Sequence, residues 1–166
     1  MSVEGQQIVS TLGADGKLVV ELVPESLPDP TGHEVLIRVE AAPINPSDLA
    51  LLFGPADLEH ADYSLGRIVA AMPEPAIRAM QARIGQPMPV GNEGAGTVIA
   101  AGDAPEAQAL LGKRVAAVPG GMYATHRIAD ARMCMALSGD LPIELGAASY
   151  VNPLTALGFV ETMRAE

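Results

Sequence analysis

The sequence predicts a mainly β fold, in which many short strands form a partly open barrel or sandwich core with a few short helices. Short apolar runs recur along the chain, separated by turns that draw on its 17 glycines and 14 prolines. The apolar fraction is 49% and the charged fraction 18%, so 166 residues are enough to bury one core. Because aromatic residues make up only 3% of the chain, aliphatic side chains and methionine must build most of that core.

The first elements are two strands, Ile8–Leu12 and Lys17–Val23, joined by the turn Gly13–Gly16, whose residues tolerate positive φ. Pro24–Gly32 is rich in Pro, Asp and Gly and is predicted to be a loop. Glu34–Glu40 alternates apolar with polar residues, which predicts a strand buried on one face.

A short helix is predicted to begin at Asn45–Asp48, because Asn45 can cap it and Pro46 suits its first turn. Gly54–Pro89 is the least regular stretch and is interpreted as an insertion into the scaffold. Within it, apolar residues at helical spacing over Pro75–Ile84 indicate one helix.

The last third of the chain returns to short elements. Three strands are predicted over Thr97–Ala100, Arg114–Val118 and Tyr123–Ala129, followed by a helical turn over Pro142–Ala148. Asn152-Pro153 repeats the pattern of a cap followed by proline, and Leu154–Met163 is predicted to be helical.

Composition excludes several function classes. The net charge is −10, which argues against a nucleic-acid surface and against binding to anionic membranes. Cys134 is the single cysteine, so neither an internal disulfide nor a cysteine-based zinc site can form. Neither a signal peptide nor an apolar run long enough to span a membrane is visible, which favours a cytoplasmic protein.

Three stretches together resemble the GroES-like catalytic domain of the medium-chain dehydrogenases/reductases. They are Gly32–Val39 running into Ile44–Asp48, then Val90–Val98 with its Gly-Asn-Glu-Gly, and finally Val151–Ala156. The resemblance implies a GroES-like, partly open barrel over residues 1–150, with 54–89 inserted, and a linker helix over 151–166 that leads toward a nucleotide-binding domain.

That nucleotide-binding domain, a Rossmann fold, is not expected within this chain. The glycines of Gly91–Gly96 have the reversed spacing G-x-x-G-x-G and precede a strand, so they do not form a phosphate-binding loop. In the family the Rossmann domain follows the last of the three stretches, whereas the chain ends at Glu166. We therefore expect 166 residues that form one half of a two-domain enzyme and are inactive alone.

The resemblance also implies an enzyme without zinc. Zinc-dependent relatives place their three catalytic ligands at the positions of Asn45, Asn92 and Asn152, and all three are asparagine here. Neutral amides are weak donors that cannot offset the charge of the metal, so a tetrahedral zinc site is not expected.

Hydride transfer without a metal requires a substrate that is already polarised, such as a quinone or an α,β-unsaturated carbonyl. The motifs are similar to those of zinc-independent quinone oxidoreductases that use NADPH or NADH. By that resemblance Asn45 and Asn92 would be catalytic, with Asn45 and Thr155 binding the cofactor. Ser47, Phe53 and Asn92 would line the cleft for a small quinone or enone substrate.

Structural roles compete with each of these assignments. Asn45 and Asn152 could be plain helix caps, Thr155 could bond within its own helix, and Ser47 could be only a first-turn residue. Tyr123 is interpreted as a packing residue, and Cys134, between two methionines, as a buried inert thiol.

Two other functions stay open. An enoyl-thioester reductase is the first, although the tyrosine that such relatives carry after the Asn45 helix has no counterpart in Ala50–Pro55. The second is a non-catalytic GroES-like binding module. The sequence does not decide the substrate, the choice between NADPH and NADH, the role of 54–89, or whether the protein forms a homo-oligomer, as family members often do.

Overall fold

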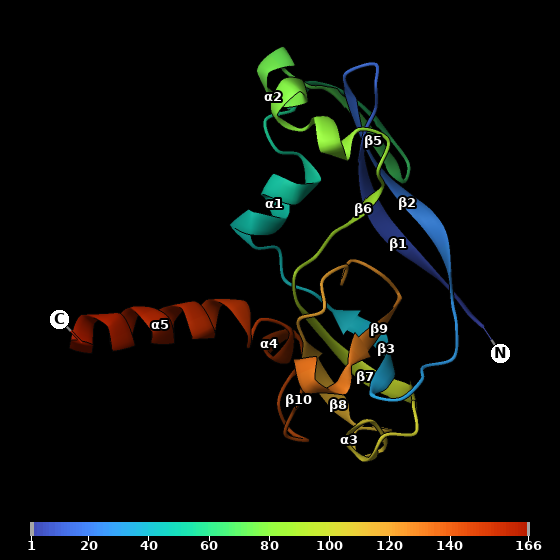
Figure 1. The fold of residues 1–166 in the computed structure, drawn as a ribbon, viewed down its shortest axis with the longest axis vertical. Coiled ribbons are helices and arrows are strands. Elements are labelled where there is room, and N and C mark those ends of the chain that lie inside the picture. Colours follow the sequence, from blue (N-terminus) through green and yellow to red (C-terminus); the bar gives the residue numbers. More distant parts are fainter. Residues whose placement is uncertain (1, 166) are drawn as a thin grey trace.

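A computed structural model describes residues 2–165, in which ten strands form two five-stranded antiparallel sheets (Figure 1). The sheets follow one another along the long axis of the molecule and do not close into a barrel. The prediction of a mainly β, partly open fold is therefore confirmed. Met1 and Glu166, the outer ends of the two predicted domains, lie outside the described residues.

The first sheet has the strand order β4-β5-β2-β1-β6. Its strands are β1 (Val3–Leu12), β2 (Lys17–Leu27), β4 (Asp57–Ser64), β5 (Arg67–Ala71) and β6 (Met88–Pro89). β1 and β2 pair along their whole length, from Val3 opposite Leu27 to Leu12 opposite Leu18. The predicted turn closes this hairpin, with the Gly13 N–H donating to the Lys17 carbonyl at 2.8 Å.

The predicted loop Pro24–Gly32 is wrong over its first four residues, because β2 continues to Leu27. Proline is tolerated there because of the side on which its nitrogen lies. The Leu22 N–H donates away from β1, to the Gly66 carbonyl, so the nitrogen of Pro24 lies on the same outer edge, beyond the end of β5. The missing N–H therefore removes no bond from the β1–β2 ladder.

Residues 54–89 are more regular than predicted. β4 and β5 form a hairpin that extends the first sheet, and β6 pairs with β1 on its other side. The helix expected over Pro75–Ile84 is shorter: α2 covers Glu74–Ala79, and a 3-10 turn follows over Gln81–Arg83.

The second sheet has the strand order β10-β8-β7-β3-β9. Its strands are β3 (Glu34–Ala41), β7 (Gly94–Ala101), β8 (Arg114–Ala117), β9 (His126–Asp130) and β10 (Cys134–Ala136). Its core is aliphatic, as the low aromatic content requires, with Val35, Ile37 and Val115 fully buried. The predicted strand over Tyr123–Ala129 is shifted, since β9 begins only at His126.

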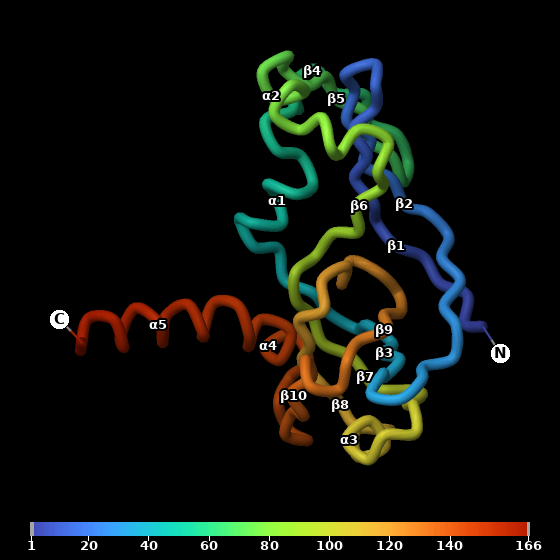
Figure 2. Tube along the Cα trace, viewed as in Figure 1, coloured from blue at the N-terminus to red at the C-terminus, as the bar shows by residue number. Residues whose placement is uncertain are grey.

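Residues 123–125 join the two sheets. The Ile8 N–H donates to the Tyr123 carbonyl at 2.8 Å, and the Thr125 N–H donates to the Gln6 carbonyl at 2.8 Å. From the other sheet, the Val39 N–H donates to the Thr125 carbonyl at 2.9 Å. The β1–β2 hairpin extends from the first sheet to the side of β9, so the segment bonds to both sheets at once (Figure 2).

Four more helices complete the fold: α1 (Pro46–Leu52), α3 (Pro105–Gln108), α4 (Ile143–Ala147) and α5 (Val151–Ala165). Asn45 is at the N-cap position of α1, as predicted, but its side chain makes no capping hydrogen bond to the helix. Asn152 is not a cap, because α5 begins one residue before it. α5 extends away from both sheets (Figure 1), and Leu154 and Phe159 on it are 57% and 68% exposed.

No helix among residues 2–165 is long and apolar enough to cross a membrane.

β3 and β7 approach each other closely at Gly96. A Cβ at Gly96 would overlap the Arg38 carbonyl, whereas a Cβ at the exposed Gly139 would meet no atom within 4 Å. We expect Gly96→Ala to lower the free energy of unfolding by about 1–3 kcal/mol, the usual effect of overpacking. Urea unfolding followed by circular dichroism measures this, and Gly139→Ala is the control. Equal midpoints for the two variants would show that β3 and β7 are further apart.

Candidate functional site

Three asparagines from distant parts of the chain converge where α1, the loop before β7 and α5 meet. Asn45 is at the N-cap position of α1, Asn92 precedes β7, and Asn152 lies in the first turn of α5. The Asn152 side-chain Nδ2 donates to the Asn45 Oδ1 at 3.0 Å. Asn92 is linked to Asn45 through the carboxylate of Asp48, which accepts from the backbone N–H groups of both. The three positions that the motifs align are thus brought together by the fold.

Asp48 connects α1 to the loop before β7. Its carboxylate is fully buried and accepts two backbone hydrogen bonds, from the Asn45 N–H at 2.8 Å and from the Asn92 N–H at 2.9 Å. The first of these is half of a capping box. A buried carboxylate is costly unless such donors replace the water it has lost, so the two bonds also fix the position of the loop.

Glu93 connects the same loop to α5. It is only 1% exposed, and its Oε1 accepts from the Asn45 Nδ2 at 3.0 Å. Its Oε2 accepts from the backbone N–H groups of Tyr150 and Val151, at 3.1 and 2.9 Å. These N–H groups open α5, where the helix dipole also favours a negative charge. Glu93 is therefore the cap of α5, supplied from another element.

Glycine makes the loop before β7 possible. Gly91 has φ +93°, and a Cβ there would lie 2.6 Å from the Tyr123 ring. The Met122 N–H donates to the Gly91 carbonyl at 2.9 Å, which holds residues 122–123 against the loop. The chain can thus pass the tyrosine closely and still aim Glu93 into the interior.

Tyr123 lies against Gly91 in the loop before β7. Its hydroxyl donates to the Pro43 carbonyl at 2.9 Å. Burial of this hydroxyl, with the nearby Asp48 carboxylate, raises the pKa of Tyr123 to about 12. The side chain is therefore neutral at physiological pH.

The other predicted site residues do not gather in one place. The Asn92 Nδ2 donates to the Ser47 Oγ at 2.9 Å, so these two predicted cleft residues bind each other at the surface. Thr155 is exposed and its hydroxyl donates to the Val151 carbonyl at 2.7 Å, which is the alternative of a bond within its own helix. Phe53 lines an apolar cleft beside α1.

This cleft has a volume of about 600 Å³ and lies between α1, the first sheet and residues 123–125. Its lining is almost entirely apolar, with Gln6 and Thr125 as polar exceptions: Gln6, Ile8, Val20, Leu22, Ala42, Ile44, Leu49, Leu52, Phe53, Ile68, Tyr123, Ala124 and Thr125. It begins beside the polar network, because Ile44 precedes Asn45 and Leu49 follows Asp48.

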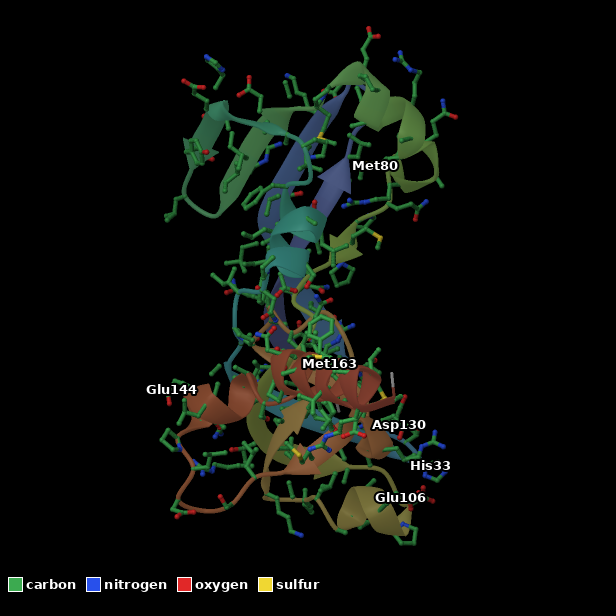
Figure 3. The ribbon with its side chains drawn as sticks, turned by 90° about the vertical axis from the view of Figure 1, so that its left-hand side faces the viewer. His33, Met80, Glu106, Asp130, Glu144 and Met163 are labelled. Carbon is green, nitrogen blue, oxygen red and sulfur yellow. The ribbon has the colours of Figure 1, made fainter. Side chains whose placement is uncertain are left out.

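The donor set of this site does not fit a zinc ion. Asn45, Asn92 and Asn152 offer only neutral amides, and both polar atoms of the Asn45 side chain are already hydrogen-bonded. Over residues 2–165, no three His, Cys, Asp or Glu side chains gather closely enough to hold a metal. His33 is remote, pairing with Glu106 at 2.6 Å near Asp130 at the far end of the second sheet (Figure 3).

Sequence reasoning missed the role of both carboxylates. The sequence predicts for Asp48 only a place at the start of a short helix, and it does not single out Glu93. One signal was present: Glu93 stands between glycines just before an apolar strand, where a lone acidic residue is expected to be buried with specific partners.

Comparison with known proteins agrees with this architecture. Residues 31–151 match the family model of the alcohol dehydrogenase GroES-like domain. Among solved structures, a proposed NADPH:quinone reductase from Mesorhizobium loti is 29% identical, with a TM-score of 0.66 over 98% of this chain and 44% of that one. A proposed NADPH:quinone reductase from Bacillus thuringiensis is 25% identical, with a TM-score of 0.66 over 93% and 40%.

A mycobacterial protein solved in complex with NADPH shares the fold at 24% identity, with a TM-score of 0.60 over 91% of this chain and 38% of that one. The chain therefore spans less than half the length of each of these three structures.

Replacing the Asp48 carboxylate tests its double role. Asp48→Asn leaves one acceptor oxygen for two buried N–H donors, so we expect the free energy of unfolding to fall by about 1–3 kcal/mol. Asp103→Asn, at an exposed loop position, is the control and should change stability little. Thermal unfolding compares them, and equal stability of the two variants would contradict the assigned bonds.

The reactivity of the Cys134 thiol should depend on pH in a way that tests its burial. Burial, aided by the charge of Asp130, raises the pKa of this thiol to about 11. Because only the thiolate reacts, we expect alkylation by iodoacetamide at pH 8 to be roughly a hundredfold slower in the folded chain than in urea. The folded rate should rise steeply as the pH approaches 11. Equal rates in both states at pH 8 would show that the thiol is not protected.

Proposed function

The chain belongs to the alcohol dehydrogenase GroES-like domain family, and from that premise we propose that it is the substrate-side domain of a two-domain NAD(P)H-dependent reductase. Residues 1–150 would be the catalytic domain, with 54–89 inserted, and 151–166 would lead to the nucleotide-binding domain. The proposed substrate is a small quinone or activated alkene, and the proposed location is the cytoplasm.

The observation that carries this proposal is the convergence of Asn45, Asn92 and Asn152 around two buried carboxylates. Charged metal ligands are absent from these three positions, and neutral donors on rigid elements take their place. A site of this kind can stabilise negative charge that develops on a substrate oxygen through hydrogen bonds alone. It suits substrates that need no Lewis acid, which is why we propose zinc-independent chemistry.

The proposed roles follow from which amide protons are uncommitted. The Nδ2 of Asn92 donates one proton to Ser47 and keeps a second that can point to a substrate oxygen. The Nδ2 of Asn45 donates one proton to Glu93 and likewise keeps a second. Thr155, one turn along α5, faces solvent where a cofactor carried by the next domain could reach it.

When bound, NADPH would supply the hydride. NADPH is favoured over NADH by the names of the Mesorhizobium loti and Bacillus thuringiensis structures, which this chain resembles at 29% and 25% identity. This chain would hold the acceptor molecule and donate hydrogen bonds to it.

We assign the ring of the substrate to the apolar cleft beside α1. The cleft starts at Ile44, one residue from Asn45, and Phe53 contributes an aromatic surface against which a quinone ring can pack. Hydride addition leaves an anion in either case. The hydroquinone oxygen can take its proton from water, whereas the enolate of an enoyl thioester must be protonated on carbon, which a placed donor assists. The hydroxyl of Tyr123 is committed to the Pro43 carbonyl, which favours the quinone over the enoyl substrate.

The direct test is NADPH oxidation by the whole protein in the presence of a benzoquinone, with an enoyl thioester assayed in parallel. We expect turnover with the quinone that a zinc chelator such as 1,10-phenanthroline leaves unchanged. The 166-residue chain alone should give none. Loss of activity with the chelator would refute the metal-free mechanism, and turnover only with the thioester would favour the enoyl reductase. A protein that turns over neither would support a binding module.

The cleft assignment has its own test. Leu49 lines the cleft and is 46% exposed, while Leu111, remote from it, is 48% exposed. We expect Leu49→Gln to raise KM for the quinone several-fold and to leave KM for NADPH unchanged, because only the apolar contact with the ring is lost. Leu111→Gln should change neither constant. If both variants behave alike, the substrate binds elsewhere.

A further inference from the structure

Glu93 can do more than cap α5, because its two oxygens face different kinds of donor. The donors to Oε2 are the backbone N–H groups of Tyr150 and Val151. A backbone N–H can only donate, unlike a side-chain amide, which can rotate to present its oxygen instead. A carboxylate carries no proton, so both of its oxygens only accept hydrogen bonds. The group that faces Oε1 must therefore be a donor as well.

The hydrogen bonds of Glu93 fix the orientation of the Asn45 amide, and Asn45 in turn fixes that of the Asn152 amide. Asn45 must turn its Nδ2 toward Glu93, which leaves its Oδ1 facing Asn152. Asn152 must then turn its own Nδ2 toward Asn45, which leaves the Oδ1 of Asn152 uncommitted. Asn45 is only 4% exposed and cannot exchange partners with water, whereas Asn152 is exposed. Across residues 2–165, no donor reaches that last oxygen.

We propose that Glu93 is a positioning residue that sets the direction of the hydrogen bonds through Asn45 and Asn152. The exposed Asn152 then presents a hydrogen-bond acceptor at the start of α5, suited to a hydroxyl group of a ligand. That this ligand is the cofactor rests on the proposed function, but the direction of the bonds does not.

Glutamine at position 93 has the same shape and reverses this direction. Its single oxygen would face the two backbone N–H groups, so its Nε2 would face Asn45. Asn45 would then have to offer its Oδ1 to Nε2 and its Nδ2 to Asn152. Asn152 would respond by turning its oxygen inward, and its outward atom would become a donor.

A pair of substitutions can restore the original direction. In Asn45→Asp the new carboxylate faces Glu93 across the 3.0 Å that now joins Nδ2 to Oε1, and the two charges repel. When Glu93→Gln is added, Nε2 donates to the new carboxylate, whose second oxygen accepts from the Asn152 Nδ2. The double variant thus has the native net charge and the native orientation of Asn152.

The experiment is a double-mutant cycle on the 166-residue chain, with Glu93→Gln, Asn45→Asp and both together. Two quantities are measured at neutral pH: the Tm, and the NMR signals of the Asn152 side-chain amide. Glu144→Gln, on the surface of α4, is the matched control (Figure 3).

We expect Glu93→Gln to shift the Asn152 amide signals and Asn45→Asp to lower the Tm by several degrees. The double variant should recover the native amide signals and most of the lost Tm, and Glu144→Gln should alter neither. If Asn45→Asp does not fold, the amide signals of Glu93→Gln and of the double variant still decide the matter.

Two results would overturn the proposal. Additive losses of stability in the double variant would mean that positions 93 and 45 do not share a directed bond. Unchanged Asn152 signals in Glu93→Gln would mean that Glu93 only caps the helix.

In the whole protein, KM for NADPH should rise in Glu93→Gln, because the outward atom of Asn152 becomes a donor. The double variant is not used for this comparison, since Asn45 is itself assigned to the site. A native protein that shows no turnover would reject the proposed function and leave the result of the NMR cycle intact.

Discussion

The carboxylate of Glu93 joins three parts of the chain that are far apart in sequence. It bonds to Asn45, 48 residues earlier, and to the first N–H groups of α5, 57 and 58 residues later. Because it is buried, each bond replaces a contact with water that folding has removed, and breaking any one leaves a buried polar group unpaired. The direction in which α5 leaves the sheets and the position of Asn45 are therefore fixed by the same group.

Asp48 and residues 123–125 provide the frame in which this group acts. Asp48 holds the loop that carries Asn92 and Glu93 against α1, through backbone N–H groups alone. Residues 123–125 bond to β1 on one side and to β3 on the other, so the two open sheets keep one relative position. The polar network lies close to this junction, between a rigid core and a helix that has few contacts of its own.

In the proposed site, neutral amides are held by charged groups that are buried away from solvent. Asp48 and Glu93 are almost completely buried, so they orient Asn45, Asn92 and the start of α5. The amides of Asn92 and Asn152 then lie at the surface, with protons and lone pairs in defined directions. In a zinc-dependent site the metal ligands themselves carry the charge. Here the charge is carried by Asp48 and Glu93, which lie behind the asparagines. This arrangement agrees with the proposed reduction of substrates that need only hydrogen bonds.

The sequence alone determined the mainly β fold and the N-cap position of Asn45, because periodicity and capping are local properties. The alignment of the three asparagines came from the resemblance to zinc-dependent relatives. Only the tertiary structure decided that β2 continues through Pro24, since that depends on where β5 ends. It also decided the roles of Asp48 and Glu93. The partners of Glu93 are largely backbone N–H groups more than 50 residues away, and every residue type except proline has that donor. No side-chain pattern in the sequence can mark such a partner, so the connection becomes visible only when the chain is folded.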